Sequence, residues 1–185
     1  MRFLFLLALV AAPSVLAQPA TPEAATPEDA AAQLTAAFQA SDFERAASLM
    51  HPDALASLKG FVGEIVALDS SGMAAMMFVG DDDPEAIAAL SPEEVFARFL
   101  GSVFGMQPEI GEALRSMEAE MIGHVMEGDS LAHVVTRSSM SMMGASVVQT
   151  DVVTTKRYGD EWRALLSGDI SNLVEGIRAG FKGEK

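Results

Sequence analysis

Residues 145–168 read ASVVQTDVVTTKRYGDEWRALLSG, and this stretch decides the fold. Its first half is rich in Val and Thr and alternates between apolar and polar positions, which is typical of a strand with one buried face. Gly159 and Asp160 then supply the residues of a tight turn before a shorter run that contains Trp162. The stretch therefore predicts two antiparallel strands joined by a hairpin.

The same alternating pattern extends back towards Met117. Turn residues at 128–129 (Gly-Asp) and at 143–144 (Met-Gly) divide it into further strands. Because short turns join consecutive strands in an antiparallel manner, these segments belong to one sheet. The expected strands cover residues 118–126, 131–142, 145–157 and 162–168.

Apolar residues at helical spacing dominate the chain before this sheet. Thr26 and Ser91 each precede a proline, which is the arrangement found at the start of many helices. A further helix is expected around residues 55–66, whereas His51 before Pro52 predicts the end of a helix. Residues 69–83 fit either a mobile flap or an extra helical turn.

After the sheet, Asp169 or Ser171 can cap a C-terminal helix that carries apolar residues at helical spacing. The chain is therefore expected to be an α+β protein with helices packed on one face of a four-stranded antiparallel sheet. Its length and the absence of an internal repeat favour a single domain over residues 27–185.

The N-terminus has the features of a secretory signal peptide. Arg2 is followed by an apolar run and by small residues that end at Ala17. This run is too short to span a membrane, so we expect cleavage near Ala17, export to the periplasm or the cell exterior, and no stable membrane anchor. Residues 18–26 are rich in Pro, Ala and Thr and are expected to form a flexible linker.

The composition excludes several classes of function. The formal net charge is −14, and the basic residues are scattered, which opposes binding to nucleic acid. The chain has no cysteine, so it has neither a disulfide framework nor a cysteine nucleophile. It also lacks a phosphate-binding loop, a nucleophile elbow and a zinc-protease helix, and no cofactor is expected.

A two-residue turn at 128–129 would place His124 opposite His133 and Glu120 opposite Arg137. These residues would share a mixed face that meets solvent or a second copy of the chain, which makes a homodimer one possible assembly. The other face carries apolar residues such as Val147 and is expected to take the helices.

One carboxyl group interrupts the apolar face of the expected sheet. Asp151 points to the same side as Val147, and Thr136 should lie opposite it. An apolar wall disfavours the charged form of a carboxyl group, so Asp151 with Thr136 is a candidate general acid or base of an isomerase or dehydratase. The alternative is that Asp151 lies at an open edge of the sheet and stays hydrated.

The expected pairing of His124 with His133 also suggests a metal site. With Met126 two residues further along the strand, these side chains could supply two nitrogens and a thioether to a copper ion. A conventional third ligand is missing, so two partly exposed imidazoles on an amphipathic face are the simpler interpretation.

Methionines occur in two clusters, at residues 73–77 and 140–143. Thioethers suit Cu(I), but methionine more often fills irregular gaps in a core. A pocket between the helices and the apolar sheet face is a third possibility. The residues expected to contact an apolar ligand there are Met140, Met142, Phe96, Phe99 and Trp162.

Helices followed by an antiparallel meander that ends in Lys156 to Gly168, with a glycine turn and Trp162, resemble the nuclear transport factor 2 superfamily of cone-shaped α+β folds. The resemblance implies a curved sheet and a pocket inside the cone, and many members bind ligands or dimerise without catalysis. Catalytic members use carboxylates, histidines and tyrosines inside the cone. This chain departs from them because Tyr158 lies in a turn and only Asp151 matches an inner carboxylate.

The sequence therefore favours an exported, non-catalytic module that binds a small apolar ligand or a protein partner. A reaction at Asp151 and copper binding by His124, His133 and Met126 are the two alternatives.

Overall fold

The structure, a computed structural model, describes residues 24–69, 71–80, 83–142 and 145–166. Within these ranges the chain forms seven helices and a four-stranded antiparallel sheet, so the predicted α+β class is confirmed. The predicted signal peptide, most of the linker and the C-terminal helix lie outside the described residues. The helices are α1 (Pro27–Gln39), α2 (Phe43–Ser48), α3 (Pro52–Leu68), α4 (Met73–Val79), α5 (Pro84–Ala89), α6 (Pro92–Met106) and α7 (Pro108–Arg115).

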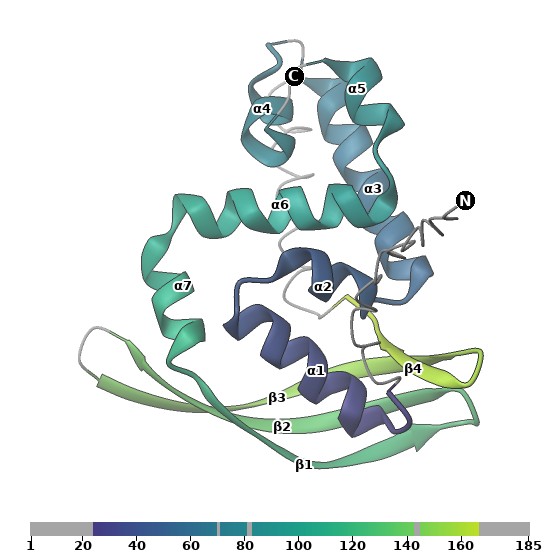
Figure 1. Ribbon diagram of the computed structural model, residues 1–185, viewed down its shortest axis with the longest axis vertical. Helices are drawn as coiled ribbons and strands as arrows, with labels where there is room; N and C mark the ends of the chain where they lie inside the picture. Colours follow the sequence, from purple (N-terminus) through teal and green to yellow (C-terminus); the bar gives the residue numbers. More distant parts are fainter. Residues whose placement is uncertain (1–23, 70, 81–82, 143–144, 167–185) are drawn as a thin grey trace, which may run out of the picture.

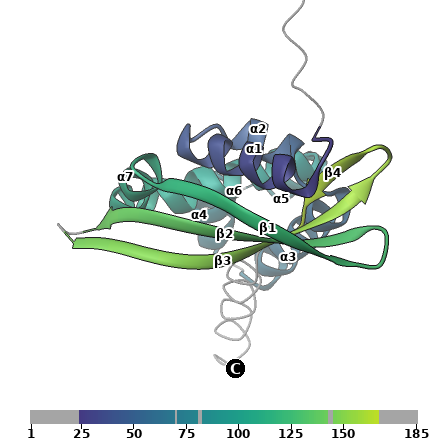
Figure 2. The same ribbon diagram turned by 90° about the horizontal axis from the view of Figure 1, so that it is seen from below.

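The four strands follow one another in space as they do in the sequence. They are β1 (Glu118–Glu127), β2 (Leu131–Met142), β3 (Ala145–Tyr158) and β4 (Glu161–Ala164). The sheet is curved (Figure 2). All the described helices lie on one side of it (Figure 1), as the sequence predicted. We call the side that faces the helices the inner face and the other side the outer face.

Local capping explains where two of the helices begin. Thr26 and Asp29 form a capping box at α1, and Ser91 and Glu94 form another at α6. Each box satisfies backbone N–H groups that the first turn of a helix leaves without partners. Ala24, which precedes the first box, is buried, and its carbonyl accepts a hydrogen bond from Trp162 N at 3.0 Å.

The main hydrophobic core lies within the helical layer rather than between the helices and the sheet. Its most deeply buried large side chains include Phe96 and Phe99 of α6 and Leu58 and Ile65 of α3. From β4, Ala164 is buried in it. A smaller cluster joins α1 to the sheet through Ala24, Ala30, Ala132 and Trp162.

The predicted register of the first hairpin was wrong over half of β1. The loop has three residues instead of two, since Glu127 pairs with Leu131. A β-bulge between Met121 and Gly123 then absorbs the extra residue, and the predicted pairing of Glu120 with Arg137 is found beyond it. Gly123 has φ of 152°, a conformation that side-chain-bearing residues rarely adopt, which explains why the bulge occurs there.

Candidate functional site

A groove of about 420 Å³ lies between α3 and α5. Helix α3 supplies one wall of the groove, because Val62 and Val66 are one helical turn apart and lie on the same face of the helix. Its apolar lining comes from Val62, Val66, Ala67, Ile87, Ala88 and Val95.

Two residues of α3, Gly63 and Lys59, determine the space and the charge of the groove. Gly63 lines it, and a Cβ atom at this position would meet no atom within 4 Å, so the missing side chain leaves open space. Lys59 stands at the rim, where its Nζ donates hydrogen bonds to Ala88 O at 3.2 Å and Leu90 O at 2.6 Å. An ammonium group has three N–H donors, so Lys59 keeps one for a further acceptor.

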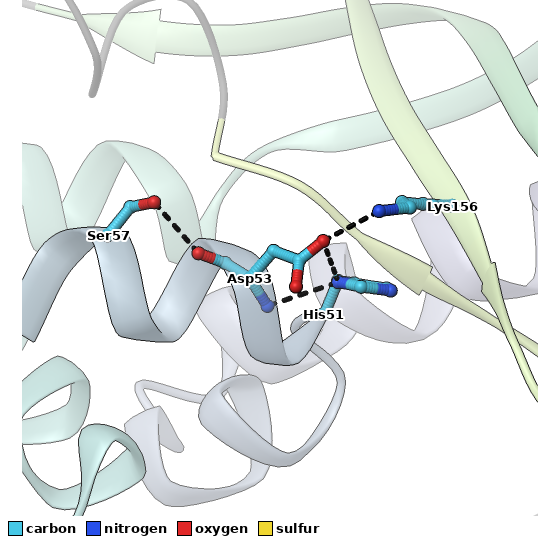
Figure 3. Close-up of polar contacts among 4 residues, drawn as sticks. All are labelled: His51, Asp53, Ser57 and Lys156. Atoms are coloured by element: carbon cyan, nitrogen blue, oxygen red, sulfur yellow. Dashed lines mark hydrogen bonds and ion pairs between the residues drawn. The ribbon is translucent and has the colours of Figure 1, made fainter.

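A polar cluster surrounds His51 where α3 meets the β3–β4 hairpin (Figure 3). The structure corrects the expectation that His51 ends a helix, because this residue is the N-cap of α3 and Pro52 is the first residue of that helix. Its Nδ1 accepts the Asp53 N–H at 3.1 Å, and its backbone N–H donates to Ala164 O at 2.7 Å. The ring meets the Tyr158 ring edge-on, with 5.6 Å between the centroids.

Burial lowers the pKa of His51 below its ordinary value of 6.5, and the Lys156 and Arg163 charges lower it further, against the opposing effect of the Asp53 carboxylate. The hydrogen bond from Lys156 Nζ, at 2.6 Å, lowers the pKa of Asp53. The Arg163 guanidinium lies 4.6 Å from the centre of the Tyr158 ring and pairs with Glu161. The lowered pKa favours the neutral form of the His51 ring. The charged groups around it are paired with one another, Lys156 with Asp53 and Arg163 with Glu161.

The hydrogen bonds of His51 decide what the cluster can do chemically. Since Nδ1 accepts a proton donor, the neutral ring carries its proton on Nε2. This tautomer donates a hydrogen bond at Nε2, and its Nδ1 lone pair faces the Asp53 N–H, with the Asp53 carboxylate 3.4 Å away. The cluster therefore ties the start of α3 to the sheet.

Asp151 and Thr136 are directly opposite each other, as the sequence predicted. They do not form the expected pair of side chains, because the Thr136 hydroxyl points at the backbone O of Asp151, at 3.4 Å. The Asp151 carboxylate instead accepts a hydrogen bond from Gln149 Nε2 at 2.7 Å and is only partly buried. Nearby, Ser138 is 4% exposed and its hydroxyl oxygen has no partner among the described residues.

The proposed copper ligands His124 and His133 lie on opposite faces of the sheet, so their predicted convergence was wrong. His124 pairs with Val134 and contacts Glu28 of α1 through Nδ1 at 2.5 Å, on the inner face. His133 pairs with Val125 and contacts Thr154 and Glu127 on the outer face. The physical cause is the three-residue loop, which shifts this part of β1 by one residue relative to β2.

Met126 shares the inner face with His124, which leaves only one imidazole on that side. Among the described residues, no group of three or more His, Asp or Glu side chains could hold a metal ion.

The residues expected to line a ligand pocket fall into separate parts of the molecule. Phe96 and Phe99 are fully buried in the helical core, and Trp162 belongs to the small cluster beside α1. Met140 is partly buried on the inner sheet face, and the side chain of Met142 lies outside the described part. The four residues of this set whose side chains are described therefore lie in three separate places: the helical core, the cluster beside α1 and the inner sheet face.

Sequence reasoning missed the groove because it did not predict α5, which forms one wall. A partial signal was present in α3, where Gly63 interrupts the run of apolar residues and leaves open space beside the groove. A glycine inside a helix costs about 1 kcal/mol relative to alanine, so its presence there suggests a local role.

Comparisons of the chain with protein-family models, with curated proteins and with solved structures found no match. The resemblance to the nuclear transport factor 2 superfamily therefore stays a prediction. Across the described ranges, no helix combines the length and apolar character needed to cross a membrane.

Proposed function

We propose that this chain is an exported, non-catalytic binding module that holds a small apolar molecule between α3 and α5. The observation that carries the proposal is the groove itself. Its volume of about 420 Å³ and its largely apolar lining match the sites that bind small molecules, which typically enclose about 300–1,000 Å³.

Lys59 narrows the class of ligand. It is the charged residue in the lining, and its third N–H is available to an acceptor. A ligand with an apolar body and one anionic or carbonyl oxygen would satisfy both the groove wall and this donor. We therefore favour an amphipathic molecule such as a small carboxylic acid over a pure hydrocarbon.

Two features of the sequence support the cellular setting and the architecture that we propose. Residues 1–17 have the pattern of a signal peptide, which favours export. Helices followed by a curved antiparallel meander are consistent with a cone of the nuclear transport factor 2 type, in which binding without catalysis is common.

Binding of the fluorescent anion 8-anilinonaphthalene-1-sulfonate tests the proposal. The probe combines an apolar ring system with a sulfonate, so it should bind the intact chain with a stoichiometry of one. The variant Gly63→Phe places a ring in the open space of the groove and should abolish binding.

Gly60→Phe is the matched control. Gly60 lies on the same helix, is exposed, and also has nothing within 4 Å of an added Cβ, but it does not line the groove. Both variants gain the same helix propensity, so they differ only in whether the new ring enters the groove. Equal probe binding by the two variants would contradict the proposal.

The outer sheet face favours a second candidate function, self-association. It exposes Val125, Val148 and Val152, three apolar side chains that a second copy of the chain would cover.

Sedimentation equilibrium tests this second candidate. A dimer at micromolar concentration that Val152→Glu converts to a monomer would support it. The mass of a single chain at every concentration would rule it out.

A further inference from the structure

Helix α4 is apolar on every side. Its buried side consists of Ala74, Ala75, Phe78 and Val79. The opposite side consists of Met73, Met76 and Met77, which are 66%, 52% and 41% exposed. Helices that are apolar all round are normally buried all round, so the three methionines are not explained by the core of this protein. The interpretation that they fill gaps in the core is wrong.

The spacing of these methionines brings their side chains together. Positions i, i+3 and i+4 share one face of a helix, with Cβ atoms about 5–6 Å apart. Each side chain has three rotatable bonds and ends in a polarisable thioether. The three sulfur atoms can therefore turn towards a common point above the helix.

The backbone beneath these side chains is held at both ends. Gly72 and Gly80 adopt left-handed conformations that bound the helix, with φ of 71° and 73°. Asp69 accepts a hydrogen bond from Ala74 N at 2.6 Å, and this bond lowers the pKa of its carboxyl group. The hydroxyl of Ser102 on α6 donates to the carbonyl of Met77. The backbone of α4 is therefore held in place, while the methionine side chains that project from it can change rotamer.

We propose that Met73, Met76 and Met77 bind one Cu(I) ion through their sulfur atoms. Thioethers are soft, uncharged ligands that select Cu(I) over the hard ions Mg²⁺ and Ca²⁺. The ion keeps its oxidation state on binding, and the sulfur lone pairs replace its previous ligands. The formal net charge of −14 favours the approach of a cation.

A face made only of methionine also distinguishes this site from a general docking surface. Any apolar side chain would serve a hydrophobic partner, whereas only methionine supplies a thioether. Substitution by leucine therefore separates the two roles, because leucine keeps the apolar surface and a similar volume but has no sulfur.

Anaerobic titration of the intact chain with Cu(I), in competition with a chromophoric Cu(I) chelator, tests the proposal. The wild-type chain should remove one equivalent of Cu(I) from the chelator. Met73→Leu/Met76→Leu/Met77→Leu should remove none. Each single Met→Leu variant should weaken binding at least about tenfold, since loss of a group that merely supports a metal ligand already costs about 10- to 100-fold.

Met106→Leu/Met126→Leu is the control, because it removes two other exposed methionines, which lie outside α4. It should bind Cu(I) as the wild type does. Binding should also be unchanged between about pH 7 and pH 5, because a thioether carries no proton to be displaced.

Retention of Cu(I) by the triple leucine variant would overturn the proposal, and so would failure of the wild-type chain to compete. The groove does not include α4. Gly63→Phe should therefore leave Cu(I) binding intact, which separates this proposal from the proposed function.

Discussion

Replacing His51 by asparagine tests whether a buried imidazole makes this fold sensitive to acid. His51 is 5% exposed, caps α3 by accepting the Asp53 N–H, and packs against Tyr158. Asparagine is also a good N-cap residue, because its side-chain oxygen accepts the same kind of hydrogen bond. It does not titrate, so His51→Asn retains the cap and removes the ionisable group.

The sign of the effect follows from the direction of the pKa shift. Burial lowers the pKa of His51 in the folded chain below the ordinary value of 6.5, so the unfolded chain takes up a proton first as the pH falls. The contribution of the neutral ring to the free energy of unfolding is therefore complete above pH 6.5 and is lost as the pH falls through the folded pKa.

The contacts of the His51 ring determine how much this residue contributes to the free energy of unfolding at neutral pH. Loss of an N-cap costs about 1 kcal/mol, and loss of an edge-to-face aromatic contact costs about 0.5–1.5 kcal/mol. We therefore expect His51→Ala to lower the free energy of unfolding by about 2 kcal/mol. His51→Asn should lower it by about 1 kcal/mol, because only the ring contact is lost.

Urea unfolding of the wild type and of His51→Asn between about pH 7.5 and pH 5 is the assay. The groups that face the ring, namely Asp53, Lys156 and Arg163, are common to both proteins, so the difference between the two curves isolates His51. This difference should shrink as the pH falls. A difference that stays constant with pH would refute the assignment of His51 as a neutral, buried cap.

Three further predictions concern the sheet and its contacts with α1. Gly123→Ala should lower the free energy of unfolding by about 1–3 kcal/mol in urea unfolding, because alanine is strained at a φ of 152°. A cost below the error of that measurement would contradict the bulge. Ser138→Ala should leave the midpoint of thermal unfolding unchanged or raise it, because the lost hydroxyl has no partner among the described residues; a fall of several degrees would mean that the hydroxyl is satisfied. The hydrogen bond to His124 lowers the pKa of Glu28, so Glu28→Gln should cost less than about 1 kcal/mol near pH 6, and the cost should vanish as the pH falls through the folded pKa of Glu28. A cost that persists in acid would exclude this ion pair as its source.

Local sequence signals predicted the secondary structure wherever the deciding contacts are local. The capping boxes at Thr26 and Ser91 join residues three apart, so the start of α1 and of α6 could be predicted. The strands could also be predicted, because alternation of apolar and polar residues is a property of each strand alone.

The register of β1 depended on information that the turn sequence does not carry. A two-residue and a three-residue loop both suit Gly128 followed by Asp129, and the choice between them changes the face of every residue up to the bulge. His124 and His133 were placed together for this reason. A glycine within a strand is a signal for a bulge, and Gly123 was the residue that could have revealed it.

Burial was the second kind of information that the sequence did not carry. His51 before Pro52 is compatible with the end of one helix and with the start of the next, and the packing of the ring against Tyr158 decides between them. Similarly, the methionines of α4 could belong to the core or to the surface. Every residue of α4 is apolar, so the sequence does not show which side of the helix is buried.

Native mass spectrometry of the intact chain, purified without detergent or denaturant, tests the central claim most directly. We expect an organic adduct of one small molecule on the wild type and on Gly60→Phe, and a bare chain for Gly63→Phe, because only the last variant fills the groove. A wild-type chain without any adduct, or an adduct that persists in Gly63→Phe, would contradict a binding function for the groove between α3 and α5.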